Sequence, residues 1–327
     1  MQKPMRVAAA LALGVAGSVG FVGQAQAQDC PRGALDARFC DRDGDMVADT
    51  PDAKQQVDPN VLIFAYTPVE DPEVYRKVYD SFLDHISKAT GKKVQFFAVQ
   101  SNAAQIEAMR AGRLHIAGYN TGATPLAVNC AGFYPFAMMA SKSGEYGYTM
   151  DIIVPADSPA KTPADLKGKK VAFTAPTSNS GYKAPSVLLK TEFKLEAEKD
   201  YTPTFSGKHD NSILGVANKD YDAAAIAYSV LSRMVGRGAV DGNKIRSIYK
   251  SDVFPTTAYG IAHNLKPELA KKIKDAFFSF KWEGTELLKE YQKSQPPQES
   301  YIPITYKQHW DVIRKIDTGA GVKYACK

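Results

Sequence analysis

The stretch that decides the fold is VAFTAPTSNSGYKAP, residues 171–185. Its apolar start, VAF, is typical of a buried strand, and the sequence beyond about residue 182 is typical of a helix. Between them lies a turn made of small hydroxyl and amide side chains and one glycine. In an open α/β sheet, such a turn lies at the carboxyl end of a strand, where ligands bind. The stretch therefore predicts an α/β fold with a ligand site at this turn.

The small side chains of this turn allow two interpretations. Ser178, Asn179 and Ser180, together with the N–H groups of the following helix, can surround an oxyanion with neutral donors, and Gly181 lets the chain turn tightly. Alternatively, Ser178 or Ser180 simply caps the helix. The sequence leaves both interpretations open.

Strands and helices alternate outward from this turn. Between residues 60 and 119 we expect strand–helix–strand–helix–strand, and the helix at 72–91 carries Val74, Val78, Phe82 and Ile86 at four-residue intervals. This order predicts parallel sheets with right-handed crossovers. Further strands are expected at 149–159, 165–176, 223–227, 245–251 and 257–264, and further helices near 211–220 and at 267–281.

The length predicts two lobes, because about 300 residues exceed what a single core usually serves. We place the first lobe at 59–153 plus 251–327 and the second at 154–250. The formal charge is +6, and the basic residues are scattered rather than gathered with aromatic ones. We therefore expect no nucleic-acid partner.

The first 27 residues have the composition of a secretory signal peptide. Lys3 and Arg6 precede an apolar run from Val7 to Val22, and Ala25-Gln26-Ala27 resembles a cleavage site. We expect cleavage after Ala27 and a soluble protein in the periplasm with a charge of +4, the two basic residues being lost. The alternative is an uncleaved membrane anchor.

Four cysteines in an exported chain predict disulfides, with three possible pairings. Proximity favours Cys30–Cys40, which leaves Cys130–Cys326. Alternatively, Cys130 is a free nucleophile or a ligand for a soft metalloid.

Residues 28–58 form an aspartate-rich extension that looks separate from the lobes. Alternate carboxylates in a turning chain are the oxygen ligands that calcium prefers, which predicts a structural calcium site. The pattern departs from an EF-hand at Gly44 and Met46, and the alternative is a solvated acidic linker. We expect no other cofactor. The candidate ligands are Asp41, Asp43, Asp45, Asp49 and Asp52.

His209 lies in a polar loop, FSGKHDN, directly before a predicted helix. One ring nitrogen could donate to an anion, although a loop histidine is more often an ordinary surface residue.

Several stretches together resemble the PhnD-like periplasmic substrate-binding proteins of phosphonate, phosphite and phosphate ABC importers. The resemblance covers roughly residues 60–290 and rests on the Ser-x-Ser-Gly turn, on Gly-x-His at 207–209 and on KSDVFP at 250–255. It implies a type II binding protein in which two α/β lobes close about a hinge over one ligand. It also implies a membrane permease as partner, a monomer, and no catalysis.

The resemblance assigns roles to individual residues. Ser178 and Ser180 match the two serines of the family's phosphonate cradle, Asn179 stands at its middle threonine, His209 matches the ligand histidine, and Tyr119 matches a tyrosine whose hydroxyl reaches the ligand.

Three positions depart from the member that binds 2-aminoethylphosphonate. Asn102 replaces a contacting tyrosine and is itself a candidate ligand-binding residue. Ser229 replaces a glutamate and Thr257 an aspartate. Because the two acids would pair with a ligand ammonium, we expect this chain to bind 2-aminoethylphosphonate poorly. Phosphate, phosphite or methylphosphonate is the expected ligand.

Two other functions compete with capture for an importer. A periplasmic sensor of arsenite-type oxyanions that partners a membrane kinase would need a free Cys130. A periplasmic phosphatase is less favoured, because the five histidines are dispersed and no nucleophile or metal-ligand motif is present in the sequence.

Overall fold

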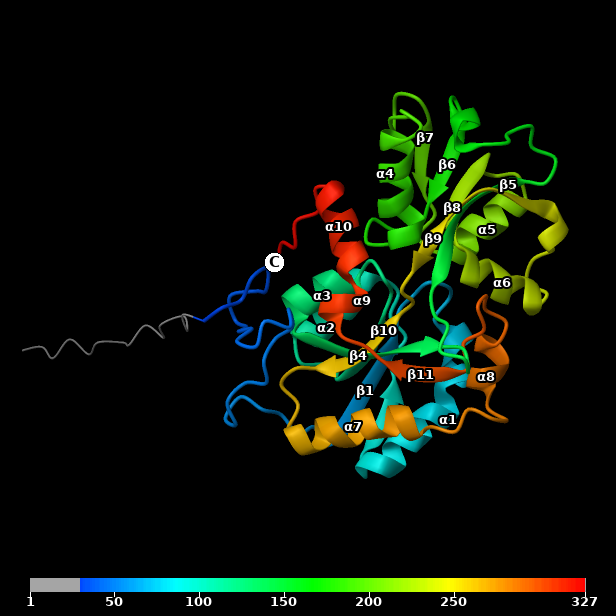
Figure 1. Ribbon diagram of the computed structural model, residues 1–327. Coiled ribbons are helices and arrows are strands. Elements are labelled where there is room, and N and C mark those ends of the chain that lie inside the picture. Colours follow the sequence, from blue (N-terminus) through cyan, green and yellow to red (C-terminus); the bar gives the residue numbers. More distant parts are fainter. Residues whose placement is uncertain (1–29, 327) are drawn as a thin grey trace, which may run out of the picture.

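The computed structural model describes residues 30–326. The predicted signal peptide and its cleavage site after Ala27 lie outside these residues. The chain forms two lobes, each built on one β-sheet flanked by helices (Figure 1). Among the described residues, no helix combines the length and apolar character needed to cross a membrane.

The first lobe contains a six-stranded sheet in the order β11-β4-β10-β3-β1-β2. Its strands come from both ends of the chain, as the discontinuous first lobe requires. They are β1 (Val61–Tyr66), β2 (Lys93–Phe96), β3 (Ile116–Tyr119), β4 (Phe133–Ala140), β10 (Ala258–Ala262) and β11 (Ser300–Pro303). The helices of this lobe are α1 (Glu73–Thr90), α2 (Asn102–Arg110), α3 (Thr124–Ala131), α7 (Pro267–Ser279), α8 (Glu286–Tyr291), α9 (Tyr306–His309) and α10 (Asp311–Gly319).

The second lobe contains a five-stranded sheet in the order β7-β6-β8-β5-β9. Its strands are β5 (Tyr148–Pro155), β6 (Lys170–Phe173), β7 (Thr202–Phe205), β8 (Ala223–Ala227) and β9 (Ile245–Phe254). Its helical segments are α4 (Ala184–Thr191), α5 (His209–Ala217) and α6 (Tyr228–Gly236), a π-helical turn (Asn179–Lys183), and short 3-10 turns at Pro163–Leu166 and Gly242–Lys244.

Both sheets are mixed, which corrects the expectation of parallel sheets. The strand–helix repeats do give parallel pairs, β2-β1-β3 in the first lobe and β7-β6-β8 in the second. However, β10 runs antiparallel between β3 and β4, and β5 runs antiparallel between β8 and β9. Both of these strands follow a crossing between the lobes, and β11 at the edge of the first sheet also runs antiparallel, to β4.

The chain crosses between the lobes at 141–147 and at 255–257. The predicted boundaries at 153/154 and 250/251 therefore need correction. All of β5 and the last residues of β9 belong to the second sheet, because β5 pairs with β8 and β9 along its length.

The periodicity of α1 is explained by its packing. Val78, Phe82 and Ile86 are buried, and Tyr75 and Tyr79 extend the same apolar face against α7 and α8. The helix ends at Gly91, whose positive φ of 71° suits glycine and whose N–H bonds to the Ser87 carbonyl.

The N-terminal extension packs on the first lobe rather than standing apart. Leu35, Phe39, Val47 and Ala48 are buried in the core. Both predicted disulfides are confirmed: Cys30 bonds to Cys40 within the extension, and Cys130 of α3 bonds to Cys326 near the C-terminus. The extension and the C-terminal end consequently lie side by side (Figure 1).

The segment around α10 contacts both lobes. Trp310 is fully buried, and its indole N–H donates to the Thr121 carbonyl of the first lobe. Asp317 forms an ion pair of 2.8 Å with Lys183 of the second lobe, and both side chains are buried. The C-terminal segment thus joins the lobes next to the π-helical turn.

Gly122 marks a point where the lobes touch through their backbones. A Cβ atom at this position would lie 2.4 Å from both the Asn179 nitrogen and the Thr177 oxygen. The Gly122 carbonyl also accepts a hydrogen bond of 2.9 Å from Lys183. Only glycine therefore permits this approach of the first lobe to the turn at 177–179.

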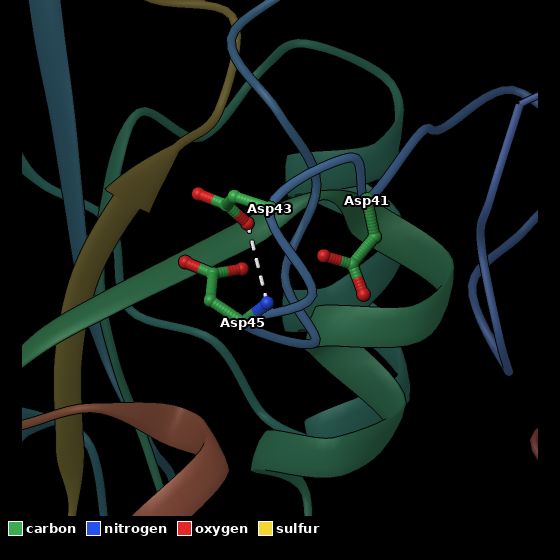
Figure 2. Close-up of side chains that lie close together, drawn as sticks. All are labelled: Asp41, Asp43 and Asp45. Atoms are coloured by element: carbon green, nitrogen blue, oxygen red, sulfur yellow. Dashed lines mark hydrogen bonds between the residues drawn. The ribbon is translucent and has the colours of Figure 1, made fainter.

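Three of the five predicted calcium ligands lie together. Figure 2 shows Asp41, Asp43 and Asp45 around one turn, and their carboxylate oxygens lie within 4.8 Å of one another. Asp49 and Asp52 are outside this group. Asp49 pairs with Arg42 at 3.1 Å instead. The Asp41 Oδ1 atom is buried and has no hydrogen-bond partner among the described residues.

The charges of this turn favour a cation. Burial raises the pKa of Asp45, and the neighbouring Asp43 and Asp41 carboxylates act in the same direction. A bound cation would relieve this repulsion and give the buried Asp41 oxygen a partner.

We expect Gly122→Ala to prevent the close approach of the two lobes. The added methyl group would overlap backbone atoms, which cannot move aside as a flexible side chain can. Distances between spin labels on the two lobes should lose their shortest component, while both lobes stay folded. Gly319→Ala is the matched control, because nothing lies within 4 Å of a Cβ there. An unchanged distance distribution in Gly122→Ala would refute this role.

We expect calcium to raise the melting temperature of the mature protein. Saturation at 100 times the dissociation constant would add about 2.7 kcal/mol to the free energy of unfolding. Asp43→Asn should remove most of this effect and Asp52→Asn should keep it, because Asp52 lies outside the cluster. Equal melting temperatures in calcium and in chelator would refute the calcium site and favour the alternative that the extension is a solvated acidic segment.

Candidate functional site

A cavity of about 50 Å³ lies between the two lobes. The second lobe contributes the turn Ser178–Ser180 and His209, and the first lobe contributes Asn120 and Thr121. Its remaining polar lining consists of Tyr66, Tyr148, Ser229, Thr256, Thr257 and Gln298, together with Arg233. The four residues predicted at the turn and at position 209 are thus brought together at one site.

The turn after β6 both caps a helix and lines the cavity, so the two interpretations are compatible. The Ser178 hydroxyl accepts a hydrogen bond of 3.0 Å from the Gly181 N–H, which is a capping contact. Ser178, Asn179 and Ser180 are nevertheless cavity-lining and almost fully buried. The Ser178 hydroxyl hydrogen remains free to donate to another group.

Gly181 fixes the shape of this turn. A Cβ atom at position 181 would lie 1.9 Å from the Thr174 hydroxyl oxygen, and the Gly181 carbonyl accepts from the Thr174 N–H at 2.9 Å. The turn continues as a π-helical segment into α4. The N–H groups of Asn179 and Ser180 fall in its first turn, where no intrahelical acceptor exists. Because both residues line the cavity, we expect these N–H groups to be donors to a ligand.

His209 is the first residue of α5 and is a neutral hydrogen-bond donor. Its Nδ1 atom accepts from the Ala227 N–H at 3.1 Å, so the ring proton lies on Nε2. Burial lowers the pKa of His209 to about 4; of the nearby charges, Glu70 opposes this shift and Arg233 adds to it. At neutral pH the ring therefore offers an N–H donor without a charge.

Asn102 is not among the residues that line the cavity, which corrects its prediction as a ligand-binding residue. Its Oδ1 atom accepts from the Asn120 amide at 2.9 Å, and its amide donates to the Thr177 hydroxyl at 2.7 Å. Asn102 thus orients a cavity-lining residue of the first lobe and links it to the turn of the second.

Tyr119 is a core residue, which corrects the prediction that its hydroxyl reaches the ligand. The hydroxyl donates to the Gln105 carbonyl at 2.9 Å, and the ring packs edge-on against Phe133. Side chains alternate between the two faces of a strand, so the neighbouring Asn120 faces the cleft instead. The cavity-lining residue of this motif is therefore Asn120, one residue after the predicted Tyr119.

Ser229 and Thr257 both line the cavity, as their alignment with the family's acidic positions predicts. In the described part of the chain, the lining includes no carboxylate side chain. The predicted aspartate cluster lies in the N-terminal extension and contributes nothing to this site.

Arg233, Tyr148 and Gln298 are lining residues that sequence reasoning missed. Arg233 looked like any basic residue of an amphipathic helix, and Gln298 lies in an irregular loop before β11. No local pattern marks either residue, because the fold alone brings these segments to the cleft.

Cys130 carries no free thiol. It is bonded to Cys326, and none of the cysteines in residues 30–326 is free. The sensor hypothesis required a free thiol at this position.

Comparisons with known proteins agree with this geometry. A family model described as "ABC transporter, phosphonate, periplasmic substrate-binding protein" matches residues 64–305. The chain is 27% identical over 279 residues to a phosphate-import protein PhnD of Mycolicibacterium smegmatis, covering 82% of this chain and 85% of that protein. It is also 27% identical to the phosphonates-binding periplasmic protein of Escherichia coli, over 67% of this chain and 66% of that one.

Solved structures share the fold. A binding protein of an ABC phosphonate transporter from Pseudomonas aeruginosa has a TM-score of 0.73 at 24% identity, covering 81% of this chain and 87% of that one. PhnD1 of Prochlorococcus marinus, solved with methylphosphonate, has a TM-score of 0.70 at 16% identity and covers 81% and 99%.

These relatives bind substrates for transport and are not enzymes, as the sequence predicts. The match spans most of the chain and both lobes. The chain belongs to the family of periplasmic substrate-binding proteins of phosphonate ABC transporters.

Proposed function

We propose that this protein captures a small phosphorus oxyanion with a neutral or absent substituent, namely phosphate, phosphite or methylphosphonate, and delivers it to an ABC importer. The observation that carries the proposal is the composition of the interlobe cavity. It is lined by hydroxyl, amide and imidazole groups at Ser178–Ser180 and His209, and its described lining includes no carboxylate.

The donors suit a tetrahedral anion. Backbone N–H groups at 179 and 180, the serine hydroxyls and the Nε2 atom of His209 come from different elements and can reach different oxygens. Each hydrogen bond to a charged partner contributes about 1.5–3 kcal/mol. Five or six such bonds, less the cost of association, reach the roughly 8 kcal/mol of micromolar binding.

The same lining disfavours a ligand that carries an ammonium group. Ser229 and Thr257 offer hydroxyls where an ammonium would need a carboxylate. Burying the cation without a partner would cost about 3–5 kcal/mol. The aspartate cluster cannot supply that partner, because it lies in the N-terminal extension.

Contacts between the lobes support a closing mechanism. The backbone N–H of His209 donates to the Val69 carbonyl of the first lobe at 3.0 Å, so the residue whose ring is proposed to bind the ligand also joins the lobes. Closure would exclude water from the ligand and present one shape to a permease. The sensor alternative loses its support because Cys130 is in a disulfide.

Calorimetry in phosphate-free buffer tests the proposed ligand class. We expect micromolar or tighter binding of at least one of phosphate, phosphite and methylphosphonate. Binding of 2-aminoethylphosphonate should be at least 100-fold weaker than that of methylphosphonate, because about 3 kcal/mol separates them. Comparable affinity for the amino compound would overturn the interpretation of Ser229 and Thr257, and no binding of the three oxyanions would overturn the proposed function.

Substitutions at the site should separate affinity from stability. Ser180→Ala should weaken oxyanion binding about tenfold, the loss of one charge-assisted bond. His209→Asn should also weaken binding about tenfold, while its side-chain oxygen can still accept from the Ala227 N–H. His209→Ala would in addition leave that buried N–H without an acceptor and lower the melting temperature.

His209→Gln is the matched control, since its amide can place a donor near the Nε2 position. It should retain more affinity than His209→Asn. Unchanged affinity in both Ser180→Ala and His209→Asn would mean that the ligand binds elsewhere.

A further inference from the structure

We infer that Arg233 supplies the positive charge of the oxyanion cavity and confers its preference for doubly charged ligands, and that an ion cluster spanning both lobes positions it there. This inference rests on the proposed function and extends it to the charge of the ligand.

Arg233 is distinguished from the rest of the lining by its charge. Among the described lining residues it alone bears an ionised side chain, since the others are hydroxyl, amide, apolar or, at His209, neutral imidazole groups. It projects from α6 and is only 2% exposed. Its charge is therefore little screened by solvent and acts strongly on an anion in the adjoining cavity.

The hydrogen bonds of Arg233 leave part of its donor capacity unused. Its guanidinium donates to the Ser294 hydroxyl at 3.2 Å, to the Glu70 carboxylate at 3.1 Å and to the Tyr75 hydroxyl at 3.4 Å. The Nε atom makes no hydrogen bond in the described part of the chain, but it faces the Glu290 carboxylate in an ion pair of 3.5 Å. A guanidinium carries five N–H groups, and a buried donor without a partner is costly. Among the described residues Nη1 donates only to Ser294, so its second N–H group is left for an oxyanion next to Arg233.

The cluster around Arg233 crosses between the lobes. Glu70 and Glu290 belong to the first lobe. Both form ion pairs with Arg233 of α6 and with Arg237, the residue that caps the C-terminal end of α6 in the second lobe. Lys293 pairs with Glu290 at 3.3 Å. These pairs set three cations against two carboxylates, so one positive charge is in excess.

Both carboxylates help to fix Arg233 when the lobes are together. Burial tends to raise the pKa of Glu70, but Arg233 and Arg237 outweigh it and the pKa lies below its ordinary value. Glu70 also accepts a hydrogen bond of 2.6 Å from Tyr75, which anchors it to α1. The guanidinium is thus held by ionised partners of the opposite lobe, beside the ligand.

Arg237 provides a matched control. It lies one turn along α6, pairs with the same two glutamates, and its side chain is 20% exposed. It does not appear among the described residues that line the cavity. Replacing Arg237 removes a cation from the cluster without removing one from the cavity wall.

The test compares two tetrahedral phosphorus ligands of different charge at pH 8.5, methylphosphonate as a dianion and dimethylphosphinate as a monoanion. Calorimetry with the mature protein gives the ratio of their affinities in each variant. Wild type should prefer the dianion at least tenfold. Arg233→Gln should reduce this preference at least tenfold, and Arg233→Lys should keep part of it, because the charge remains but the planar fork is lost.

Arg237→Gln should reduce the preference much less than Arg233→Gln does, because its side chain is 20% exposed and does not line the cavity. If Arg233→Gln weakens both ligands equally, Arg233 only holds the lobes together and the inference is wrong. If wild type binds methylphosphonate without preferring the dianion, the inference is also wrong, while the proposed function stands. Absence of any binding to wild type would instead overturn the proposed function.

Should Arg233→Gln fail to fold because Glu70 loses a cation, Glu70→Gln combined with Arg233→Gln removes both charges and gives the same comparison. Circular dichroism establishes folding before each titration.

Discussion

An anion withdrawn from water must receive hydrogen bonds from the protein in place of its hydration shell, and the site depends on this constraint. Here the donors are divided between two lobes. The turn at Ser178–Ser180 and the ring of His209 belong to the second lobe, and Asn120 and Thr121 belong to the first. Neither lobe alone encloses the cavity, so the proposed function makes ligand binding and closure of the lobes parts of one event.

Several buried contacts join the lobes around that cavity. On one side Lys183, which follows the turn directly, reaches both the Gly122 carbonyl and Asp317 of the C-terminal helix. On another side Glu70 holds Arg233. Breaking a buried ion pair by removing one partner typically costs about 3–5 kcal/mol. Opening the lobes would instead return both partners to water, which costs less than leaving one of them buried alone.

The sequence predicted those features that local physics determines. Apolar runs and four-residue periodicity identified most strands and helices, and the turn at 178–181 was located because glycine and small donors have a distinct chemistry there. It did not predict that Tyr119 faces the core while Asn120 faces the cleft, since the phase of β3 depends on its pairing with β1 and β10. The sequence did not predict that Arg233 lines the cavity either, because the partners that hold it lie up to 163 residues away in the chain.

A crystal structure of the protein with the tightest of the tested oxyanions bound is the most direct test of this account. The account predicts the phosphorus atom between the two lobes, with its oxygens within hydrogen-bonding distance of the Ser178–Ser180 turn and of the His209 Nε2 atom. Ligand density outside the interlobe cavity, with that turn and His209 making no contact to it, would contradict the account.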